Sequence, residues 1–167
     1  MVSIEEVEKR FEKKIKWLKE ELPQKYHRDT IIQRNCAAYT VLSIMDILDM
    51  NDTNIINMAA PLAGITRVCG AVAAGLMMVG MIVGKKGAEE ITQFRASTEG
   101  MRYLKRFYKE FESIQCPVLT GYDLLTQEGM QNYIKEDVWG KKCYMHIVKT
   151  VEIIGKLYKK QIAELIE

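Results

Sequence analysis

The feature that most constrains this chain is a run of seventeen residues without a charge, Val68–Gly84. Its sequence, VCGAVAAGLMMVGMIVG, is apolar all the way round a helix rather than along one stripe, which is typical of a helix buried on every side. Its four glycines each lower helix propensity by roughly 1 kcal/mol relative to alanine, so packing has to stabilise it. The run falls short of the ~20 residues that cross a bilayer. We therefore expect a central core helix rather than a membrane span.

The composition favours a single all-α domain. A chain of 167 residues is long enough for one sizeable core, and it contains only three prolines but ten methionines. Its 24 basic and 22 acidic residues nearly balance, so nothing in the overall charge indicates nucleic acid or an anionic membrane as a partner. The N-terminal stretch is charged from the fifth residue and has no apolar signal region, which predicts a cytoplasmic protein.

Helical periodicity predicts a bundle of about six or seven helices over residues 1–167. The expected helices are 3–21, one that begins between 29 and 35 and ends near 48, then 53–60, 68–84, 88–114, a short one from 126, and about 140–166. Ser3 and Glu6 form a capping-box pattern at the first of them. Residues 3–22 are expected as an additional amphipathic helix, either a solvated outer helix or a dimerisation arm, before a four-cysteine unit at about 30–160.

Four cysteines are the candidate functional residues: Cys36, Cys69, Cys116 and Cys143. Permanent disulfides are rare in a reducing compartment. The four are far apart in sequence and no CxxC pair is present, so only the fold could bring them together. The alternative is that they are buried small apolar residues, which is a common fate of free cysteine.

The sequence around the cysteines favours thiolates. Cys36 and Cys69 are expected near the starts of helices, where free N–H groups and the helix dipole stabilise negative charge. Basic residues lie close by in sequence: Arg34, Arg67, Lys141 and Lys142. Cys116 directly precedes Pro117, so it is expected in an extended connection between two helices.

The two histidines carry less information. His146 follows Cys143 by three residues on one helix face, so the pair could share a metal ion. A histidine packed in the core is the preferred interpretation, and His27 is expected to be exposed. The sequence contains no Walker A, Rossmann, HExxH or GxSxG motif, and no CxxCH for covalent haem.

Four segments in order resemble one known family: Asn35–Ala38 (NCAA), Cys69–Val72 (CGAV), Ser113–Cys116 (SIQC) and Cys143 ahead of the final helix. The chain is similar, from about residue 35 to 158, to a redox-active family named for four cysteines and a Cys-Gly-Ala-x-x-Gly motif. The resemblance implies that Cys36, Cys69, Cys116 and Cys143 are the site, with Gly70 and Ala71 keeping the backbone beside Cys69 accessible.

Two positions depart from the family pattern. The last glycine of the motif falls on Ala74, and Gly75 takes the next place. The glycine-rich loop before the motif reads APLAGITR and keeps only Gly64. A domain similar to this family accompanies haem segments in split-Soret cytochromes, so the resemblance extends to an iron–sulfur or electron-transfer role.

The leading hypothesis is that the four cysteines converge to bind an iron–sulfur cluster or carry electrons. The alternatives are dithiol–disulfide exchange and a zinc-stabilised or metal-free helical interaction module. Cys36 and Cys69 are expected as the closest pair, with Cys116 and Cys143 closing the site from the other side. A homodimer that uses the apolar stripes of helices 3–21 and 88–114 is expected, together with a redox partner protein.

Overall fold

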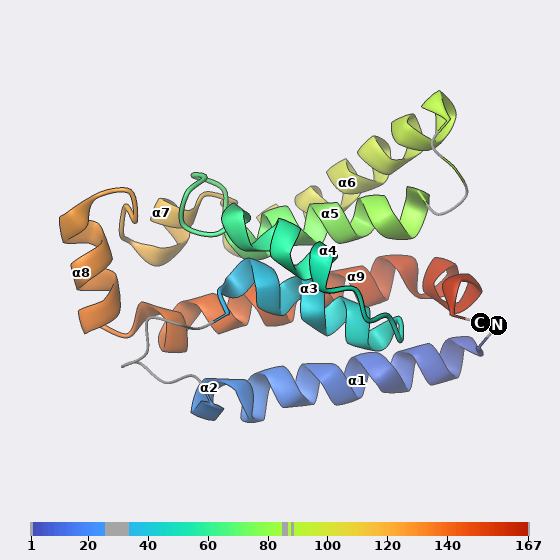
Figure 1. The fold of residues 1–167 in the computed structure, drawn as a ribbon, viewed down its shortest axis with the longest axis horizontal. Helices are drawn as coiled ribbons and strands as arrows, with labels where there is room; N and C mark the ends of the chain where they lie inside the picture. The colour runs from blue at the N-terminus through green and yellow to red at the C-terminus, as the bar shows by residue number, and fades with distance from the viewer. Residues whose placement is uncertain (1, 26–33, 85–86, 88, 167) are drawn as a thin grey trace.

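The long helices of this chain lie side by side in layers, with α1 on one side, α3 and α9 in the middle, and α5 and α6 on the other (Figure 1). The computed structural model describes residues 2–25, 34–84, 87 and 89–166. The elements are α1 (Ile4–Glu20), α2 (Leu22–Lys25), α3 (Cys36–Ile47), α4 (Thr53–Ala59), the 3-10 turn η1 (Ala60–Leu62), α5 (Gly70–Gly84), α6 (Glu90–Phe111), α7 (Cys116–Thr120), α8 (Gln127–Lys135), the π-helical turn η2 (Trp139–Cys143) and α9 (Tyr144–Leu165). Over these residues there is no strand, only an isolated bridge between Val68 and Gln115.

The all-α class is confirmed, but the expected number of helices was too low. Nine α-helices occur within the described residues, and the two that the sequence did not predict are the short α2 and α7. Each carries a proline in its first turn, Pro23 in α2 and Pro117 in α7. Proline is tolerated there because the N–H groups of the first turn have no partner within the helix.

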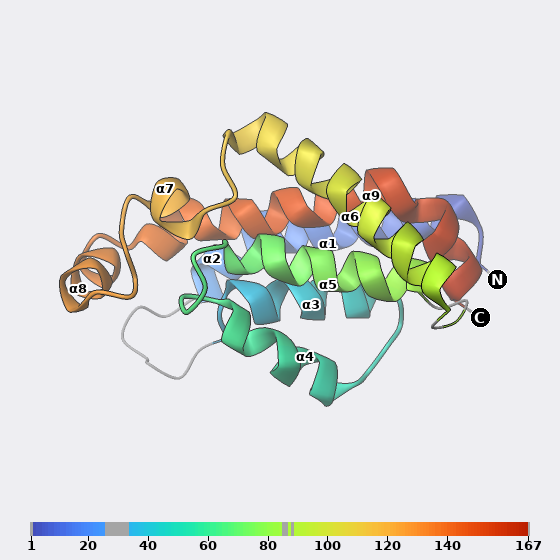
Figure 2. The ribbon, with the colours of Figure 1, turned by 90° about the horizontal axis from the view of Figure 1, so that it is seen from above.

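The central position of the uncharged run is confirmed. Its helix, α5, packs against α3, α6 and α9, and none of its fifteen residues is fully exposed. Its buried residues include Ala71, Val72, Met78 and Val79. Figure 2 shows α5 in the middle of the bundle, between α4 on one side and α6 on the other. None of the described helices is long and apolar enough to span a membrane.

Two glycines of α5 differ sharply in what surrounds them. A Cβ on Gly75 would clash with the hydroxyl oxygen of Tyr103 and would lie 2.8 Å from the side chain of Thr150, and both of these residues are fully buried. A Cβ on Gly80 would meet nothing within 4 Å. Gly75, and not Ala74 one residue earlier, is therefore where α6 and α9 need the helix backbone without a side chain.

A matched pair of substitutions tests this difference. Gly75→Ala should lower the free energy of unfolding by about 1–3 kcal/mol, because the methyl group overpacks a rigid core. Gly80→Ala should raise it by roughly 0.5–1 kcal/mol through higher helix propensity. Urea unfolding followed by circular dichroism measures both. Equal changes in the two variants would show that Tyr103 yields to the added methyl.

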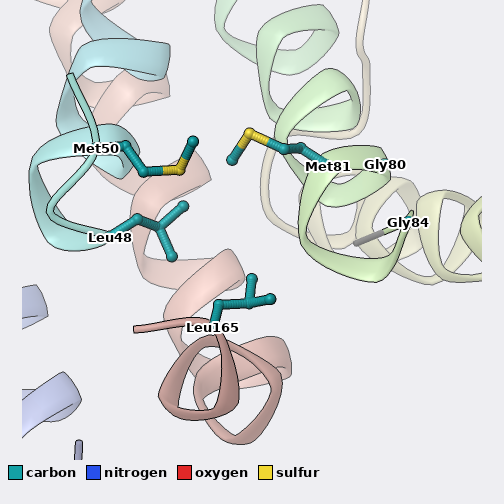
Figure 3. A pocket seen from close by; sticks show the side chains of 6 residues that line it. All are labelled: Leu48, Met50, Gly80, Met81, Gly84 and Leu165. Atoms are coloured by element: carbon teal, nitrogen blue, oxygen red, sulfur yellow. The ribbon is translucent and has the colours of Figure 1, made fainter. Parts of the chain in front are cut away.

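Gly80 borders an apolar cavity of about 470 Å³ at the C-terminal end of α5. Its lining residues are Leu48, Met50, Gly80, Met81, Gly84 and Leu165. Figure 3 shows the side chains of Met50 and Met81 extending toward each other into it. The lining comes from the ends of α5 and α9 and the residues after α3, which lie at the end of the bundle away from α7 and α8 (Figure 1).

The first helix is covered within the chain. The Ser3 hydroxyl accepts a hydrogen bond from the N–H of Glu6 at 3.1 Å, so the predicted N-cap is confirmed. Its apolar stripe, which includes Phe11, packs on α9, where Gly155 gives Phe11 room for close contact. An ion pair between Lys19 and Glu152 at 2.8 Å joins the edges of the two helices. The stripe of α1 is therefore not the free dimerisation surface that its sequence suggested.

Helix directions gather several helix starts at one end of the bundle. Helices α3, α5 and α9 run the same way, whereas α1 and α6 run the opposite way (Figure 1). The N-terminal ends of α3, α5 and α9 consequently meet beside α7 and α8 (Figures 1 and 2). Every cysteine of the chain lies at such a helix start or directly before one.

Candidate functional site: the four-cysteine end of the bundle

Cys36 is the first residue of α3, and its position is fixed by the residue before it. Asn35 caps the helix by accepting a hydrogen bond from the N–H of Ala38 at 3.0 Å. The same amide donates to the carbonyl oxygen of Ala60 at 2.8 Å. This asparagine therefore satisfies the start of α3 and also attaches it to the segment that leads to Cys69.

Cys69 and Cys116 are held together by a short backbone ladder. The N–H of Cys69 donates to the carbonyl of Ile114 at 2.8 Å, and the N–H of Cys116 donates to that of Arg67 at 2.7 Å. These bonds lie on either side of the antiparallel Val68–Gln115 bridge. Because side chains alternate between the two faces of a ladder, both cysteines project to the face opposite Val68 and Gln115. Residues 47 positions apart thus become diagonal neighbours.

Cys116 also corrects the prediction of an extended connection. It is the first residue of α7, and its carbonyl accepts a hydrogen bond from the Thr120 hydroxyl at 2.7 Å. The extended residue is Gln115, the N-cap, with φ −86° and ψ 127°. Pro117 therefore does not keep Cys116 out of the helix, and the prediction of an extended Cys116 is wrong.

Cys143 ends the π-helical turn η2 and is buried at 6% exposure. Its Sγ lies 3.1 Å from the hydroxyl oxygen of Tyr133 in α8, at hydrogen-bonding distance. The preceding residue, Lys142, donates from Nζ to the carbonyl of Thr120 at 2.9 Å, which joins η2 to α7. Single π-helical turns are rare in proteins overall, but those that occur are often found at functional sites.

Gly70 and Ala71 complete the site between Cys36 and Cys69. A Cβ on Gly70 would lie 2.7 Å from the Sγ of Cys36, so that sulfur occupies the space a side chain would need. The backbone N–H of Ala71 lies close enough to the sulfurs of Cys36 and Cys69 to lower the pKa of both thiols. Both sulfurs therefore lie near the first turn of α5.

Burial raises the pKa of every cysteine thiol. The pKa rises to about 11 at Cys69 and about 12 at Cys143, and it also rises at Cys116. At Cys36 burial places the pKa well above its usual value, and negative charge on each of the other three cysteines raises it further. The four thiols are thus close enough to influence one another. A metal ion or cluster that binds all four has to displace four protons.

These pKa directions show that the expectation of favoured thiolates was wrong. Arg67 is paired with Asp123 at 3.0 Å, and the charge of Asp123 raises the pKa of Cys116. Lys142 does lower the pKa of Cys143, but it is the smallest of the contributions there, and burial is the largest. Backbone N–H groups at the start of α5 also lower the pKa of Cys69, and burial again outweighs them.

His146 does not join the cysteines. It is 4% exposed and packs edge-on against Phe111 and Phe107 of α6, at 4.9 and 6.3 Å between ring centroids. Within the described part of the chain, its Nδ1 has no hydrogen-bond partner. His27 lies outside the described residues. Across residues 2–25, 34–84, 87 and 89–166, no three Cys, His, Asp or Glu side chains are grouped as ligands of one metal ion.

The different exposures of the cysteines predict an order of chemical modification. In the reduced, metal-free protein, Cys116 should react with iodoacetamide about tenfold or more faster than Cys69 and Cys143, because it is partly exposed and they are buried with pKa values of about 11 and 12. Mass spectrometry of tryptic peptides at increasing times gives each rate. Similar rates at all three would mean that this end of the bundle opens faster than alkylation occurs.

Sequence reasoning missed the residues that connect the cysteine segments. Tyr133 and Thr120 contact cysteines, yet neither stands at a distinctive spacing from them. Lys142 was expected only as a basic neighbour of Cys143, and its hydrogen bond to Thr120 was not predicted. Tyr133 was visible only as an apolar position of a short amphipathic helix. Its role depends on how α8 docks, which no local pattern records.

Fold and site together define a class: an all-α protein that gathers four cysteines from four separate segments at one end of a helical bundle. The family described as "Putative redox-active protein (C_GCAxxG_C_C)" matches residues 34–157, and the chain belongs to this family. The match confirms the resemblance seen in the cysteine-bearing segments. No curated protein and no solved structure matches the chain.

Proposed function

We propose that Cys36, Cys69, Cys116 and Cys143 bind one iron–sulfur cluster and that the protein transfers electrons through it. The observation that carries this proposal is the mutual proximity of four thiols from four segments. Negative charge on Cys69, Cys116 or Cys143 raises the pKa of Cys36, so all three lie near it. Four thiolates are the usual ligands of both common cluster types, and the family is redox-active. When bound, the cluster supplies one-electron chemistry.

Four cysteine donors suit an iron–sulfur cluster and also a structural zinc ion. Zinc holds its four ligands at about 2.3 Å and so draws their sulfurs close together, whereas a cluster places iron and sulfide between the cysteine sulfurs and spaces them farther apart. The redox character of the family favours the cluster, because zinc does not change its oxidation state.

The surrounding residues then have defined roles. The thiols of Cys36, Cys69 and Cys143 are buried and would hold the cluster away from water, whereas Cys116 is partly exposed and would form the side nearest solvent. The Tyr133 hydroxyl hydrogen-bonds to Cys143, and such bonds to ligand sulfurs adjust reduction potentials. Gly70 leaves room for the sulfur of Cys36.

Dithiol–disulfide exchange is the second candidate, favoured by the position of the Cys36 and Cys69 sulfurs beside the same backbone group, that of Ala71. Thiols that carry out such exchange usually have lowered pKa values. Burial instead raises the pKa values of Cys36 and Cys69, which argues against this candidate. A zinc-stabilised or metal-free interaction module is the remaining alternative, and the experiment below separates all of these.

Anaerobic purification with iron, acid-labile sulfide and zinc analysis tests the proposal, together with visible and electron paramagnetic resonance spectra. Iron and sulfide in matching amounts, with a visible band bleached by dithionite, are expected. Stoichiometric zinc without a visible band would replace the cluster by a zinc site. A metal-free protein with a reversible Cys36–Cys69 disulfide would establish thiol exchange. A protein with neither a metal nor such a disulfide would be an interaction module.

The proposed setting follows from the chemistry of the site. The protein is proposed to work in the cytoplasm, where thiols stay reduced. It is further proposed to form a homodimer and to exchange electrons with a separate redox partner protein at the cysteine end of the bundle.

A further inference from the structure

Helix α6 carries a line of exposed apolar side chains along its outer face, which we call the α6 stripe. The stripe consists of Ile91, Phe94, Thr98, Met101, Lys105 and Tyr108, and all six are exposed. Its four large apolar members are 57–71% exposed. The spacing alternates between three and four residues, which is the a/d pattern of helices that pack along their length.

This stripe is separate from the face that α6 buries in its own chain. Tyr103 and Phe107 are fully buried on the inner face, against the core around α5 and α9. Single exposed apolar residues are ordinary on protein surfaces. Four large ones aligned along one face of a 22-residue helix, with Thr98 and Lys105 between them, mark an interaction surface.

The two apolar stripes of the sequence have different fates in the fold. That of α1 packs on α9, with Val7 and Leu18 fully buried. That of α6 is exposed to solvent, and the helix itself lies at the edge of the bundle (Figures 1 and 2). This inference rests on the homodimer proposed above. Of the two apolar stripes expected to form that dimer, only the α6 stripe is left uncovered by the chain itself.

We infer that the occupant of the α6 stripe is the α6 stripe of a second copy, packed antiparallel about a two-fold axis. The charges favour this direction. Over residues 89–99 three acidic residues stand against one basic residue, Arg95, whereas over residues 100–112 four basic residues stand against two acidic ones, Glu110 and Glu112. Antiparallel packing brings the acidic start of each helix to the basic end of the other, but parallel packing brings like charges together.

The same packing gives each stripe residue a partner. With the axis between Glu99 and Gly100, Ile91 faces Tyr108 of the second copy and Thr98 faces Met101 of the second copy. Phe94 faces Lys105 of the second copy. The aliphatic part of that lysine covers the phenylalanine ring, and its ammonium group lies at the face or edge of the ring. Each contact occurs twice, as an isologous interface requires. This inference does not depend on what the cysteines bind.

The test compares Phe94→Glu and Met101→Glu with a control, Met58→Glu. Met58 is 67% exposed on α4, away from the α6 stripe. Sedimentation equilibrium of the intact protein at micromolar concentrations should give twice the chain mass of 19.2 kDa for wild type and control. Both stripe variants should raise the dimer dissociation constant at least about thirtyfold, with unchanged circular dichroism.

Charge exchange tests the direction. Glu90 faces Lys109 of the second copy in this register, so Glu90→Lys alone should weaken the dimer, and adding Lys109→Glu should restore it. A double variant weaker than the single one would overturn the antiparallel arrangement. If both stripe variants still dimerise as wild type does, the α6 stripe is not the interface, although the protein is a homodimer. If wild type is a monomer at every concentration, both the α6 interface and the homodimer are overturned.

Discussion

Replacing any one of Cys36, Cys69, Cys116 and Cys143 with serine is expected to lower bound iron at least about tenfold and to remove the visible band. A cluster with four cysteine ligands loses coordination whichever ligand is removed, and the remaining thiols are buried groups with raised pKa values. Iron and sulfide analysis of anaerobically purified variants, beside the visible spectrum, measures the effect.

Val118→Ser is the matched control for these four variants. It lies two residues after Cys116, is 65% exposed, and should keep the iron content and spectrum of wild type. Losses restricted to Cys36 and Cys69 would support dithiol exchange instead of a cluster. If no serine variant differed from the control, the cysteines would be core residues without redox function.

Acidification should destabilise the folded protein through His146, by up to about 3 kcal/mol between pH 6.5 and 4. Burial first, and the charge of Lys142 second, lower the pKa of this histidine from 6.5 to about 4. The folded state therefore binds fewer protons than the unfolded state in this range. Stability is complete above the unfolded pKa and falls as the pH drops toward the folded one.

Urea unfolding of the metal-free protein at pH 7.5, 6, 5 and 4 measures this effect. The informative quantity is the difference between wild type and His146→Gln, because glutamine stays neutral throughout. Glu152, whose carboxyl pKa is lowered by Lys19 and Lys149 despite the opposing effect of burial, contributes to acid loss equally in both proteins. A pH-independent difference would mean that His146 is protonated without cost in the folded state.

The sequence alone determined the helical architecture and the chemistry available to it. The uncharged run of α5 is central because nothing along it can face water at low cost, and Ser3 caps α1 because a hydroxyl there satisfies an N–H three residues on. Flanking residues of the cysteines identified the family. These features are local, and their physical cause lies within a few residues along the chain.

Only the tertiary structure decided how distant residues meet. The Val68–Gln115 bridge aligns Cys69 with Cys116, and Tyr133 reaches Cys143 only because α8 docks beside η2. Burial at that meeting point, which sequence proximity to basic residues could not reveal, raises the thiol pKa values instead of lowering them. Likewise, the stripes of α1 and α6 look alike in sequence, yet α9 covers one and leaves the other exposed. Periodicity states which face of a helix is apolar, but the packing of the whole chain selects what covers it.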